Sequence, residues 1–415
     1  MKKICVLGLG YIGLPTAAMF ATHGFKVLGV EIKEDVVEIL NNGDVHIQEP
    51  GLRTLAQAAL KSGNLIPSLK PDHSDVFIIA VPTPLLKEEK KGDLSYVISA
   101  AESIVPFLEP GNLVILESTS PPRTTMDILV PILERSGLEV SREGSESATS
   151  FYLAHCPERV LPGRILKELV HNDRVIGGVD RAAAQMAKEL YSSFVEGEIF
   201  LTDATTAEMV KLMENTYRDV NIALANEFSL VAEKVGINIW EAIEIANRHP
   251  RVNILKPGPG VGGHCIAVDP WFIVQAAPEV TPLIQTTRQV NDGMPAQVVR
   301  LVKRAVAEVE RPVIACLGLT YKGDVDDIRE SPAIRVIELL RAEGFGLQAF
   351  DPFVPMGAIP EQVSNIEAAI SGADAVLILT DHSAFKGLHL DDIGCPVIDT
   401  RDVLDVPEYS REPII

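Results

Sequence analysis

Long apolar runs are missing from this sequence: no stretch of its 415 residues approaches the roughly 20 consecutive apolar residues that a membrane-spanning helix needs. The opening MKKICVLGLG enters strand-like residues without the apolar segment and small-residue cleavage site of a secretory signal. Low-complexity tracts are also absent, which predicts a chain that folds throughout. We therefore expect a soluble, cytoplasmic protein with no membrane partner.

Basic residues are scarce relative to acidic ones. The sequence has 37 Lys and Arg against 57 Asp and Glu, a formal net charge of -20. The field of such a chain repels polyanions, which argues against a nucleic-acid or anionic-membrane surface. An acidic small-molecule substrate would need cations placed locally around it.

Cysteine is also sparse. The five cysteines, Cys5, Cys156, Cys265, Cys316 and Cys395, lie far apart, without the close pairs of a zinc site or a secreted disulfide framework. Cys5 and Cys316 sit in apolar, strand-like runs, where cysteine behaves as a small buried hydrophobe. We expect no metal, and we expect reduced thiols.

The first 31 residues have the pattern of strand, glycine turn, helix and strand. Gly8, Gly10 and Gly13 form GxGxxG, and Glu31 closes the second strand. In such a unit the glycines allow a tight turn, close approach of the backbone to a pyrophosphate, and packing of the helix on the strand. Glu31 can accept hydrogen bonds from both ribose hydroxyls but would repel a 2′-phosphate. The pattern predicts binding of NAD in preference to NADP.

The stretches SDVFIIAVPTP and GNLVILEST predict two more strands, with a helix from about Ser95 between them, so that the doubly wound sheet continues. Ligands of such sheets bind beyond the carboxyl ends of the strands. Thr83 and Thr119, which follow these strands, are therefore predicted to lie beside the cofactor.

The residues from Ala204 to Gly236 predict one long helix, since the stretch lacks proline and internal glycine. Thr205 with Glu208 has the spacing of a capping box at its start, and Gly236 is placed to end it. A helical region between two sheet domains often forms a subunit interface.

After Arg311 a second series of alternating strands and helices begins. Its first turn keeps Gly318 and Gly323 but inserts other residues between them, which favours a mononucleotide or nucleotide sugar over a dinucleotide. Lys322 and Arg329 supply cations for a pyrophosphate.

The predicted fold is therefore α/β, with two Rossmann-like doubly wound domains joined by a central helical region that contains one long helix. We expect an NAD-binding domain at 1–203, a helical dimerisation and catalytic region at 204–300, and a nucleotide-sugar (UDP) binding domain at 301–415.

Cys265 follows a glycine-rich stretch, GPGVGGHC, and precedes Asp269 by four residues. Glycine is used where backbone bends or approaches a ligand closely, which buried filler would not need. A thiolate there could add to an aldehyde, and the thiohemiacetal could lose a hydride to NAD and become a thioester. Lys211 could shuttle protons and Asn215, one helical turn later, could stabilise an oxyanion. The residues alone leave this reading open beside the other uses of a single cysteine.

Motifs along the whole chain, GLGYIGLP, VPTP, EST, CPERVLPG, AEMVKLMENTYRDVNIALANE, GPGVGGHCIAVDPWF and YKGDVDDIRESPA, resemble the UDP-glucose/GDP-mannose dehydrogenase family. The resemblance implies oxidation of a sugar C6 alcohol to a carboxylate with two NAD reduced. Where the glucose branch commonly has serine before the cysteine and lysine before the aspartate, this chain has His264 and Val268. It is more similar to the branch that oxidises UDP-N-acetyl-D-mannosamine for surface polysaccharides, with the N-acetylglucosamine and N-acetylgalactosamine branches as alternatives.

The resemblance also implies site residues and an assembly. The catalytic positions are matched by Cys265 as nucleophile, Lys211 as acid/base, Asn215 with Lys211 as oxyanion stabilisers, Asp269 and Thr119 as positioners of water and protons, and Glu158 as a general base. The cofactor positions are matched by Gly8, Gly10, Tyr11, Ile12, Gly13, Glu31, Lys33, Thr83 and Thr119. The substrate positions are matched by Arg159, Val160, Lys211, Asn215, Arg218, His249, Arg251, Gly262, Tyr321, Lys322 and Arg329. Family members are homodimers or higher homo-oligomers, with Arg251 expected to reach the neighbour's site.

Two other functions are compatible with parts of the sequence. A single-step hydroxyacid or sugar-phosphate dehydrogenase also pairs a Rossmann domain with long helices, but it would need no cysteine. A non-catalytic sensor of NAD or nucleotide sugars would bind both ligands without turnover.

Overall fold

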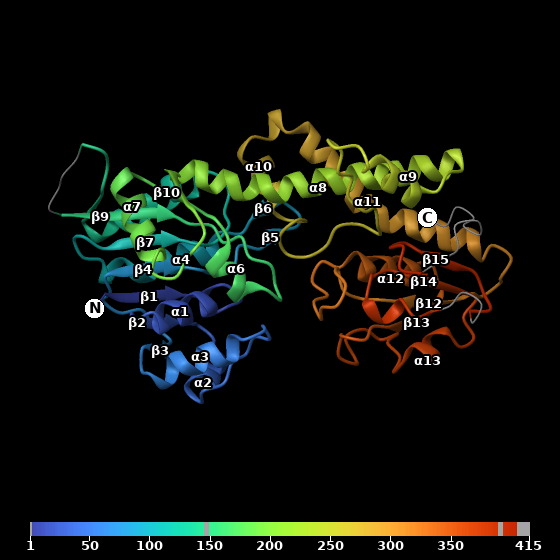
Figure 1. Ribbon diagram of the computed structural model, residues 1–415, viewed down its shortest axis with the longest axis horizontal. Coiled ribbons are helices and arrows are strands. Elements are labelled where there is room, and N and C mark those ends of the chain that lie inside the picture. The colour runs from blue at the N-terminus through green and yellow to red at the C-terminus, as the bar shows by residue number, and fades with distance from the viewer. Residues whose placement is uncertain (1, 145–148, 389–392, 405–415) are drawn as a thin grey trace. The chain divides into compact units, whose positions relative to one another are not determined.

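The computed structural model describes residues 2–144, 149–388 and 393–404. The last residues of the predicted third domain, 405–415, lie outside the described part. The chain forms two compact units, Met1–Glu214 with Trp271–Pro278, and Asn215–Pro270 with Glu279–Ile415. Each unit is built around its own sheet (Figure 1).

The sheet of the first unit has the strand order β11-β10-β9-β7-β4-β1-β2-β3, with β8 beside β9. Its strands are parallel except for the antiparallel pairing of β9 with β10. The strands are β1 (Lys3–Leu7), β2 (Lys26–Val30), β3 (Leu65–Ser68), β4 (Val76–Ile79), β7 (Leu113–Leu116), β8 (Glu139–Val140), β9 (Ser150–His155), β10 (Arg174–Gly178) and β11 (Ile199–Asp203). The order reverses between β1 and β4, which is where dinucleotide-binding sheets hold their ligand.

Helices cover both faces of this sheet. On one face, α1 (Gly13–Thr22), α3 (Leu52–Lys61), α6 (Ile165–His171) and α7 (Arg181–Tyr191) share a buried cluster with the strands. On the other, α4 (Ser95–Ile104) and α5 (Val130–Leu133) do so. Helix α2 (Glu34–Asn41) adds Val36 and Leu40 to the first cluster. Other elements of this unit are the hairpin β5 (Leu85–Leu86) and β6 (Lys91–Gly92), the short turns η1 (Val105–Phe107) and η3 (Glu134–Ser136), and one π-helical turn, η2 (Thr125–Leu129), that leads into α5. Cys5 is buried in this core, as expected, and burial raises the pKa of its thiol to about 12.

The long helix α8 (Ala204–Val235) forms where predicted and ends before Gly236, which has a φ of 74°. The predicted capping box was wrong. Asp203 accepts the backbone N–H of Thr206 at 2.9 Å and its hydroxyl at 2.6 Å, as an N-capping aspartate does. The carboxylate of Glu208 instead turns to residues 123 and 125, far away in sequence. The spacing of Thr205 and Glu208 matches a capping box, but Glu208 forms its hydrogen bonds with a distant loop instead.

The second unit contains a parallel sheet of order β13-β12-β14-β15. The strands are β12 (Val313–Leu317), β13 (Gly346–Phe350), β14 (Ala375–Ile378) and β15 (Val397–Asp399). One face packs with α11 (Pro282–Ala305) and α12 (Pro332–Ala342), the other with α13 (Ile366–Ile370). Two doubly wound sheets and a long central helix confirm the predicted fold class.

Helix α11 is fastened to α8 by buried polar groups as well as by apolar packing. Arg288 pairs with Asp219 at 2.6 Å, and Asn291 bonds both Asp219 and Asn226. A further helix, α9 (Ile239–Ala246), packs its Ile239 and Ile243 on α8 through Ala232. These contacts make the central part of the chain continuous with the second sheet domain in this unit.

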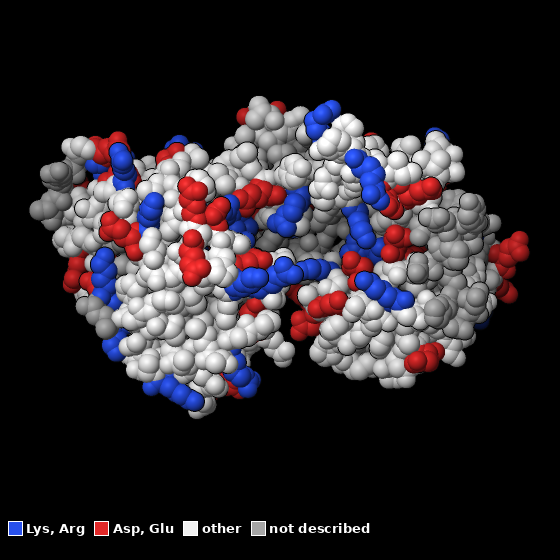
Figure 2. All heavy atoms as spheres, in the orientation of Figure 1, with Lys and Arg blue, Asp and Glu red and all other residues white. Residues whose placement is uncertain are grey.

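Charged side chains are mixed on the surface. On the face shown in Figure 2, Lys and Arg lie among Asp and Glu, so local cations are available in a chain whose formal net charge is -20. In the described part of the chain, no helix has the length and apolar composition that crossing a membrane would require.

Candidate active site

In the glycine turn after β1, the fold requires glycine at positions 8 and 13 but not at position 10. A Cβ on Gly8 would lie 2.7 Å from the carbonyl oxygen of Ala80, and one on Gly13 would lie 1.8 Å from that of Gly8. Gly8 also has a φ of 89°. Gly10, by contrast, is exposed, and a Cβ added to it would meet nothing within 4 Å. The space at Gly10 is therefore open to a ligand, as the approach of a pyrophosphate requires.

Glu31 follows β2 and is held by backbone donors. Its carboxylate accepts the N–H groups of Leu9 at 3.1 Å, Ile32 at 2.9 Å and Lys33 at 3.2 Å. These bonds tie the carboxylate to the glycine turn and leave it half-exposed. Tyr11 is 41% exposed, and it precedes Ile12 at the start of α1, on the same turn. Lys33 is exposed and forms the N-cap of α2.

Thr83 and Thr119 meet at the carboxyl ends of neighbouring strands β4 and β7. The hydroxyl of Thr83 donates to the carbonyl oxygen of Thr119 at 2.6 Å, and Ser118 donates to the carbonyl oxygen of Val81 at 2.6 Å. Both threonines are half-buried. The structure thus brings these two predicted residues together at the edge of the sheet where cofactors bind.

Glu158 follows β9 and is fixed by a buried ion pair. Its carboxylate accepts from Arg174 at 2.8 Å, with side-chain exposures of 8% and 5% respectively. The guanidinium of Arg174 also lies 4.8 Å from the ring centre of Tyr191. Removing either partner of such a pair would leave a buried charge, so the pair holds the Glu158 side chain in place.

Glu117 lies in the same buried cluster, directly after β7. Tyr191 donates its hydroxyl to one carboxylate oxygen, while the other oxygen is buried with no partner among the described residues. Burial, reinforced by the charge of Glu158, raises the pKa of Glu117 to about 7. The carboxylates of Glu117 and Glu158 and the guanidinium of Arg174 therefore share one buried cluster.

The other two predicted site residues near Glu158 are Arg159 and Val160, which are half-buried. Arg159 pairs with Glu214 and donates to the carbonyl oxygen of Asp173. Lys211 is 8% exposed on α8. These residues all belong to the first unit.

In the second unit, the glycine loop before Cys265 is tightly packed. A Cβ on Gly262 would lie 2.5 Å from the carbonyl oxygen of Glu330 and 2.7 Å from the Cβ of Tyr321. Gly263 has a φ of 81° and faces the ring of Tyr321, and its N–H donates to the carbonyl oxygen of Arg329. The loop therefore packs against the segment that follows β12, which contains three predicted substrate residues, Tyr321, Lys322 and Arg329.

Cys265 is half-buried and its carbonyl oxygen accepts the N–H groups of Val268 at 3.0 Å and Asp269 at 2.8 Å. This turn leads into α10 (Asp269–Ala276). The carboxylate of Asp269 accepts from the amide of Asn215, whose oxygen accepts from Arg218. Asn215 and Asp269 are 0% and 3% exposed. Four predicted residues are therefore linked, directly or through the chain, in one part of the second unit.

The remaining predicted substrate residues are more exposed. Lys322 is exposed, as is Arg329, which forms an ion pair with Asp327 at 2.6 Å. His249 and Arg251 are both exposed, in the turn after α9, and the backbone N–H of Arg251 donates to the His249 ring at 3.3 Å. Their contact with a substrate, and the reach of Arg251 into a neighbour's site, stay predictions.

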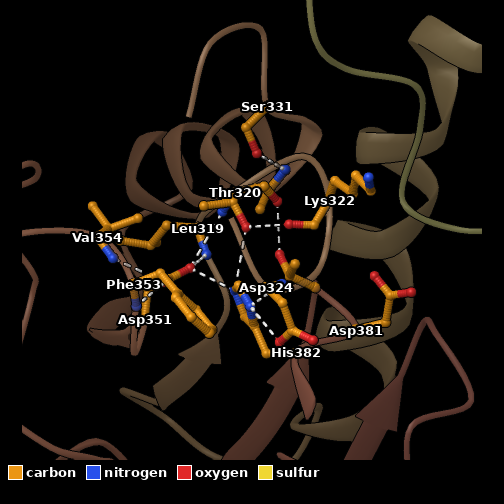
Figure 3. Close-up of polar contacts among 12 residues, drawn as sticks. Leu319, Thr320, Lys322, Asp324, Ser331, Asp351, Phe353, Val354, Asp381 and His382 are labelled. Atoms are coloured by element: carbon orange, nitrogen blue, oxygen red, sulfur yellow. Dashed lines mark hydrogen bonds and ion pairs between the residues drawn. The ribbon is translucent and has the colours of Figure 1, made fainter. Parts of the chain in front are cut away.

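The second unit has a glycine turn like that of the first, but the carboxylate beside it is covered by other side chains of the protein. Asp351 follows β13 as Glu31 follows β2, and it accepts the N–H of Leu319 at 2.7 Å. It is buried, and the ring of His382 lies 2.9 Å from it (Figure 3). Because the N–H of Asp324 donates to the other ring nitrogen at 2.9 Å, the nitrogen facing Asp351 carries the proton. A ribose therefore has no access to this carboxylate of the kind that Glu31 offers.

Models of known families match three consecutive parts of the chain. They are described as the UDP-glucose/GDP-mannose dehydrogenase family NAD-binding domain, at residues 2–195, its central domain, at 205–293, and its UDP-binding domain, at 315–406. The chain belongs to the UDP-glucose/GDP-mannose dehydrogenase family.

Full-length relatives agree with this. A UDP-N-acetyl-D-mannosamine dehydrogenase of Methanococcus maripaludis is 51% identical over 98% of this chain and 94% of its own. An NDP-N-acetyl-D-galactosaminuronic acid dehydrogenase of Ralstonia nicotianae is 48% identical over 96% of both chains. The solved structure of a UDP-D-ManNAc dehydrogenase from Pyrococcus horikoshii has a TM-score of 0.90 and 46% identity, covering 98% of this chain and 97% of its own.

As a member of this dehydrogenase family, the protein is an NAD-dependent oxidoreductase, and NAD is its cofactor. The open space at Gly10 and the half-exposed carboxylate of Glu31 fit that cofactor: the first leaves room for a pyrophosphate, and the second could accept hydrogen bonds from a ribose diol. The UDP-binding domain model covers the second sheet, whose turn at Asp351 is closed by His382.

Three residues that the sequence analysis did not single out are distinguished in the structure by their burial and contacts. Arg174 and Glu117 form the buried cluster below Glu158. Arg401 follows β15, its Nε is buried without a partner among the described residues, and its guanidinium packs against Gly258. Arg174 and Glu117 lie far from their partners in the sequence, so no motif or residue spacing could have indicated these contacts. The position of Arg401 just beyond a strand end was the available clue.

Proposed function

We propose that this enzyme oxidises the C6 alcohol of UDP-N-acetyl-D-mannosamine to the carboxylate of UDP-N-acetyl-D-mannosaminuronate, with reduction of two NAD. The observation that carries the proposal is the 51% identity to the Methanococcus maripaludis UDP-N-acetyl-D-mannosamine dehydrogenase over 98% of this chain. The proposal is further supported by the hydrogen bond that Asn215 donates to Asp269, four residues after Cys265.

In the proposed reaction, Lys211 accepts the proton of the C6 hydroxyl as the first hydride leaves for NAD and an aldehyde forms. The thiolate of Cys265 then adds to the aldehyde carbon and forms a C–S bond, and Lys211 with Asn215 stabilises the alkoxide oxygen of the thiohemiacetal. Loss of a second hydride to a second NAD converts the thiohemiacetal to a thioester.

Water then attacks the thioester carbonyl, the C–S bond breaks, and the carboxylate leaves with the thiol restored. Glu158 accepts the proton of that water, and Asp269 and Thr119 orient it. The structure supports defined positions for these groups, since Glu158 is held by Arg174 and Asp269 by Asn215.

We propose that three consecutive parts of the chain have separate roles. Residues 1–203 bind NAD, 204–300 form the central helical region and 301–415 bind the UDP moiety. Arg401 is added to the predicted phosphate-binding cations Lys322 and Arg329, because its guanidinium is partly buried at a strand carboxyl end in a domain matched by a UDP-binding model.

The enzyme is proposed to be a homodimer that pairs through α8. Apolar side chains recur along one exposed stripe of this helix at heptad-like spacing: Tyr217, Leu224, Phe228, Val231 and Val235, which are 65%, 45%, 40%, 52% and 61% exposed. A second copy of the same stripe is the simplest complement. Light scattering of the intact protein tests this, with Phe228→Lys expected to yield monomers and the exposed Glu227→Lys expected to leave the dimer intact.

A second sugar is favoured by a specific observation, the 48% identity to an NDP-N-acetyl-D-galactosaminuronic acid dehydrogenase. The two sugars differ in the directions of ring substituents, which is worth about 1–3 kcal/mol of contacts. NADH formation with UDP-linked N-acetylmannosamine, N-acetylgalactosamine, N-acetylglucosamine and glucose separates them. Greatest kcat/KM with a sugar other than N-acetylmannosamine would overturn the substrate proposal.

The thioester step is tested by stoichiometry. Limiting sugar should yield two NADH, and Cys265→Ala should abolish formation of the uronate, because no covalent intermediate can form. Cys395→Ala, which changes a half-buried cysteine elsewhere, should retain wild-type turnover. A yield of one NADH, or full turnover by Cys265→Ala, would contradict the mechanism.

A further inference from the structure

Glu208 makes an unusual set of contacts at the start of α8. It is 1% exposed, and burial raises the pKa of its carboxyl group. One carboxylate oxygen accepts both the backbone N–H of Thr125 at 2.7 Å and its hydroxyl at 2.6 Å, while the other accepts the N–H of Arg123 at 2.5 Å. The first N–H groups of a helix have no partner within the helix, so Glu208 caps the turn η2 from a distant part of the chain.

The capped segment is the loop that carries Thr119. Arg123, at the end of this loop, has a φ of 74°, a conformation that costs a residue other than glycine about 1 kcal/mol or more. The bond from its N–H to Glu208 stabilises that conformation. At the other end of the loop, Thr83 holds the carbonyl oxygen of Thr119 at 2.6 Å. The loop is thus fastened to the sheet at one end and to α8 at the other.

Lys211 lies three residues after Glu208, so the two side chains project from the same face of α8. Both are buried, at 1% and 8% exposure. A helix cannot rotate about its axis or slide along it without breaking the three bonds of Glu208. Those bonds therefore determine where α8 presents Lys211 relative to the loop of Thr119.

We propose that Glu208 is a positioning residue for the dehydrogenase reaction, which fastens α8 to the Thr119 loop and so places the amine of Lys211 for proton transfer. This inference rests on the proposed function in one respect, that Lys211 exchanges protons with the substrate. A purely structural cap would affect only stability, whereas a positioning residue acts on turnover through Lys211.

The experiment is a double-mutant cycle of Glu208 with Lys211, measured as kcat of NADH formation by the full-length enzyme at saturating NAD and sugar. Glu208→Ala is expected to lower kcat about 100-fold, the cost of misplacing a catalytic group, with KM for NAD changed less than about threefold. Glu208→Gln keeps one acceptor oxygen for Thr125 but turns an NH2 group toward the N–H of Arg123, so an intermediate kcat is expected. In a Lys211→Ala background, Glu208→Gln should cause little further loss.

Two further variants make the outcome unambiguous. Thr125→Val removes only the hydroxyl donor and should lower kcat less than Glu208→Gln does. Glu227→Ala, a change of an exposed glutamate on the same helix, should have wild-type kcat. Thermal unfolding of each variant shows whether it is folded at the assay temperature. If Glu208→Ala is unfolded, the proposal is tested with Glu208→Gln and Thr125→Val.

Folded Glu208 variants with wild-type kcat would overturn the proposal, as would effects of Glu208→Gln and Lys211→Ala that multiply fully in the double variant. Failure of the proposed function has a different signature. If the wild-type enzyme prefers another sugar, the cycle is run with that sugar, and if Lys211→Ala itself leaves kcat unchanged, the assigned role of Lys211 and with it this inference both fail.

Discussion

Glu31 and Asp351 hold equivalent positions in the two sheets of the enzyme. Each follows the second strand of its sheet and accepts the N–H of the leucine after the first turn glycine, Leu9 in one case and Leu319 in the other. They differ in what surrounds them. Glu31 is half-exposed, whereas Asp351 is buried against His382. The same backbone contact thus holds an accessible carboxylate in one domain and a carboxylate closed off by His382 in the other.

The exposed carboxylate should determine the choice of cofactor. Glu31→Ala is expected to raise KM for NAD about tenfold, through loss of hydrogen bonds to the ribose, and to narrow the preference for NAD over NADP by removing a charge that repels the 2′-phosphate. Initial rates with both cofactors measure this. Asp351→Asn is the matched control, since it should lower thermal stability and leave the NAD/NADP ratio unchanged. An unchanged ratio in Glu31→Ala would contradict the role of Glu31.

The glycines of the first turn should separate folding from binding. Gly10→Val is expected to fold with a near wild-type melting temperature, because a Cβ at this exposed position meets nothing within 4 Å, but to lose NAD binding measured by calorimetry. Gly13→Ala should fail to fold stably, since its Cβ would lie 1.8 Å from the carbonyl oxygen of Gly8. Tight NAD binding by Gly10→Val would show that the pyrophosphate does not approach this position.

Glu117 should make stability depend on pH. Its folded pKa is raised to about 7 from 4.5, so the folded state favours the protonated form. The resulting stabilisation is complete below the unfolded pKa and is lost as the pH rises through about 7. Relative to the wild type, the free energy of unfolding of Glu117→Gln should rise on the order of 1–3 kcal/mol across this window. Urea titrations at several pH values test it. The exposed Glu38→Gln is the control, and parallel curves for Glu117→Gln and wild type would refute the assignment.

Thiol reagents should distinguish the cysteines. Burial raises the pKa of Cys5, Cys156 and Cys316 to about 12, so these thiols are both inaccessible and protonated in the folded enzyme. Cys265 is half-buried and should react with iodoacetamide, with loss of activity in proportion to its labelling. Peptide mass spectrometry locates the label. Bound UDP sugar should slow the modification of Cys265, and labelling of Cys156 before Cys265 would disprove this ordering.

Much of the fold could be predicted because its signals are local. Gly8 and Gly13 are required by contacts with the next few residues and with the neighbouring strand, and α8 runs to Gly236 because nothing in its sequence interrupts it. The residues assigned to the site by family motifs, such as Cys265 and Asp269, were found for a different reason, which is that the motifs persist along the whole chain. Their roles remain proposals.

The sequence by itself determined the two glycine turns, the long helix and the acid after the second strand of the first domain, because the limits on backbone conformation and the order of strand, turn and helix are local features of the chain. Only the tertiary structure decided that Glu208 caps a turn 83 residues away instead of its own helix, that Glu117 shares a buried cluster with Arg174 and Tyr191, and that His382 closes the second turn. A carboxylate binds whichever donors the folded chain places against it, and burial makes those contacts strong. Such contacts cannot be predicted from the spacing of residues along the chain.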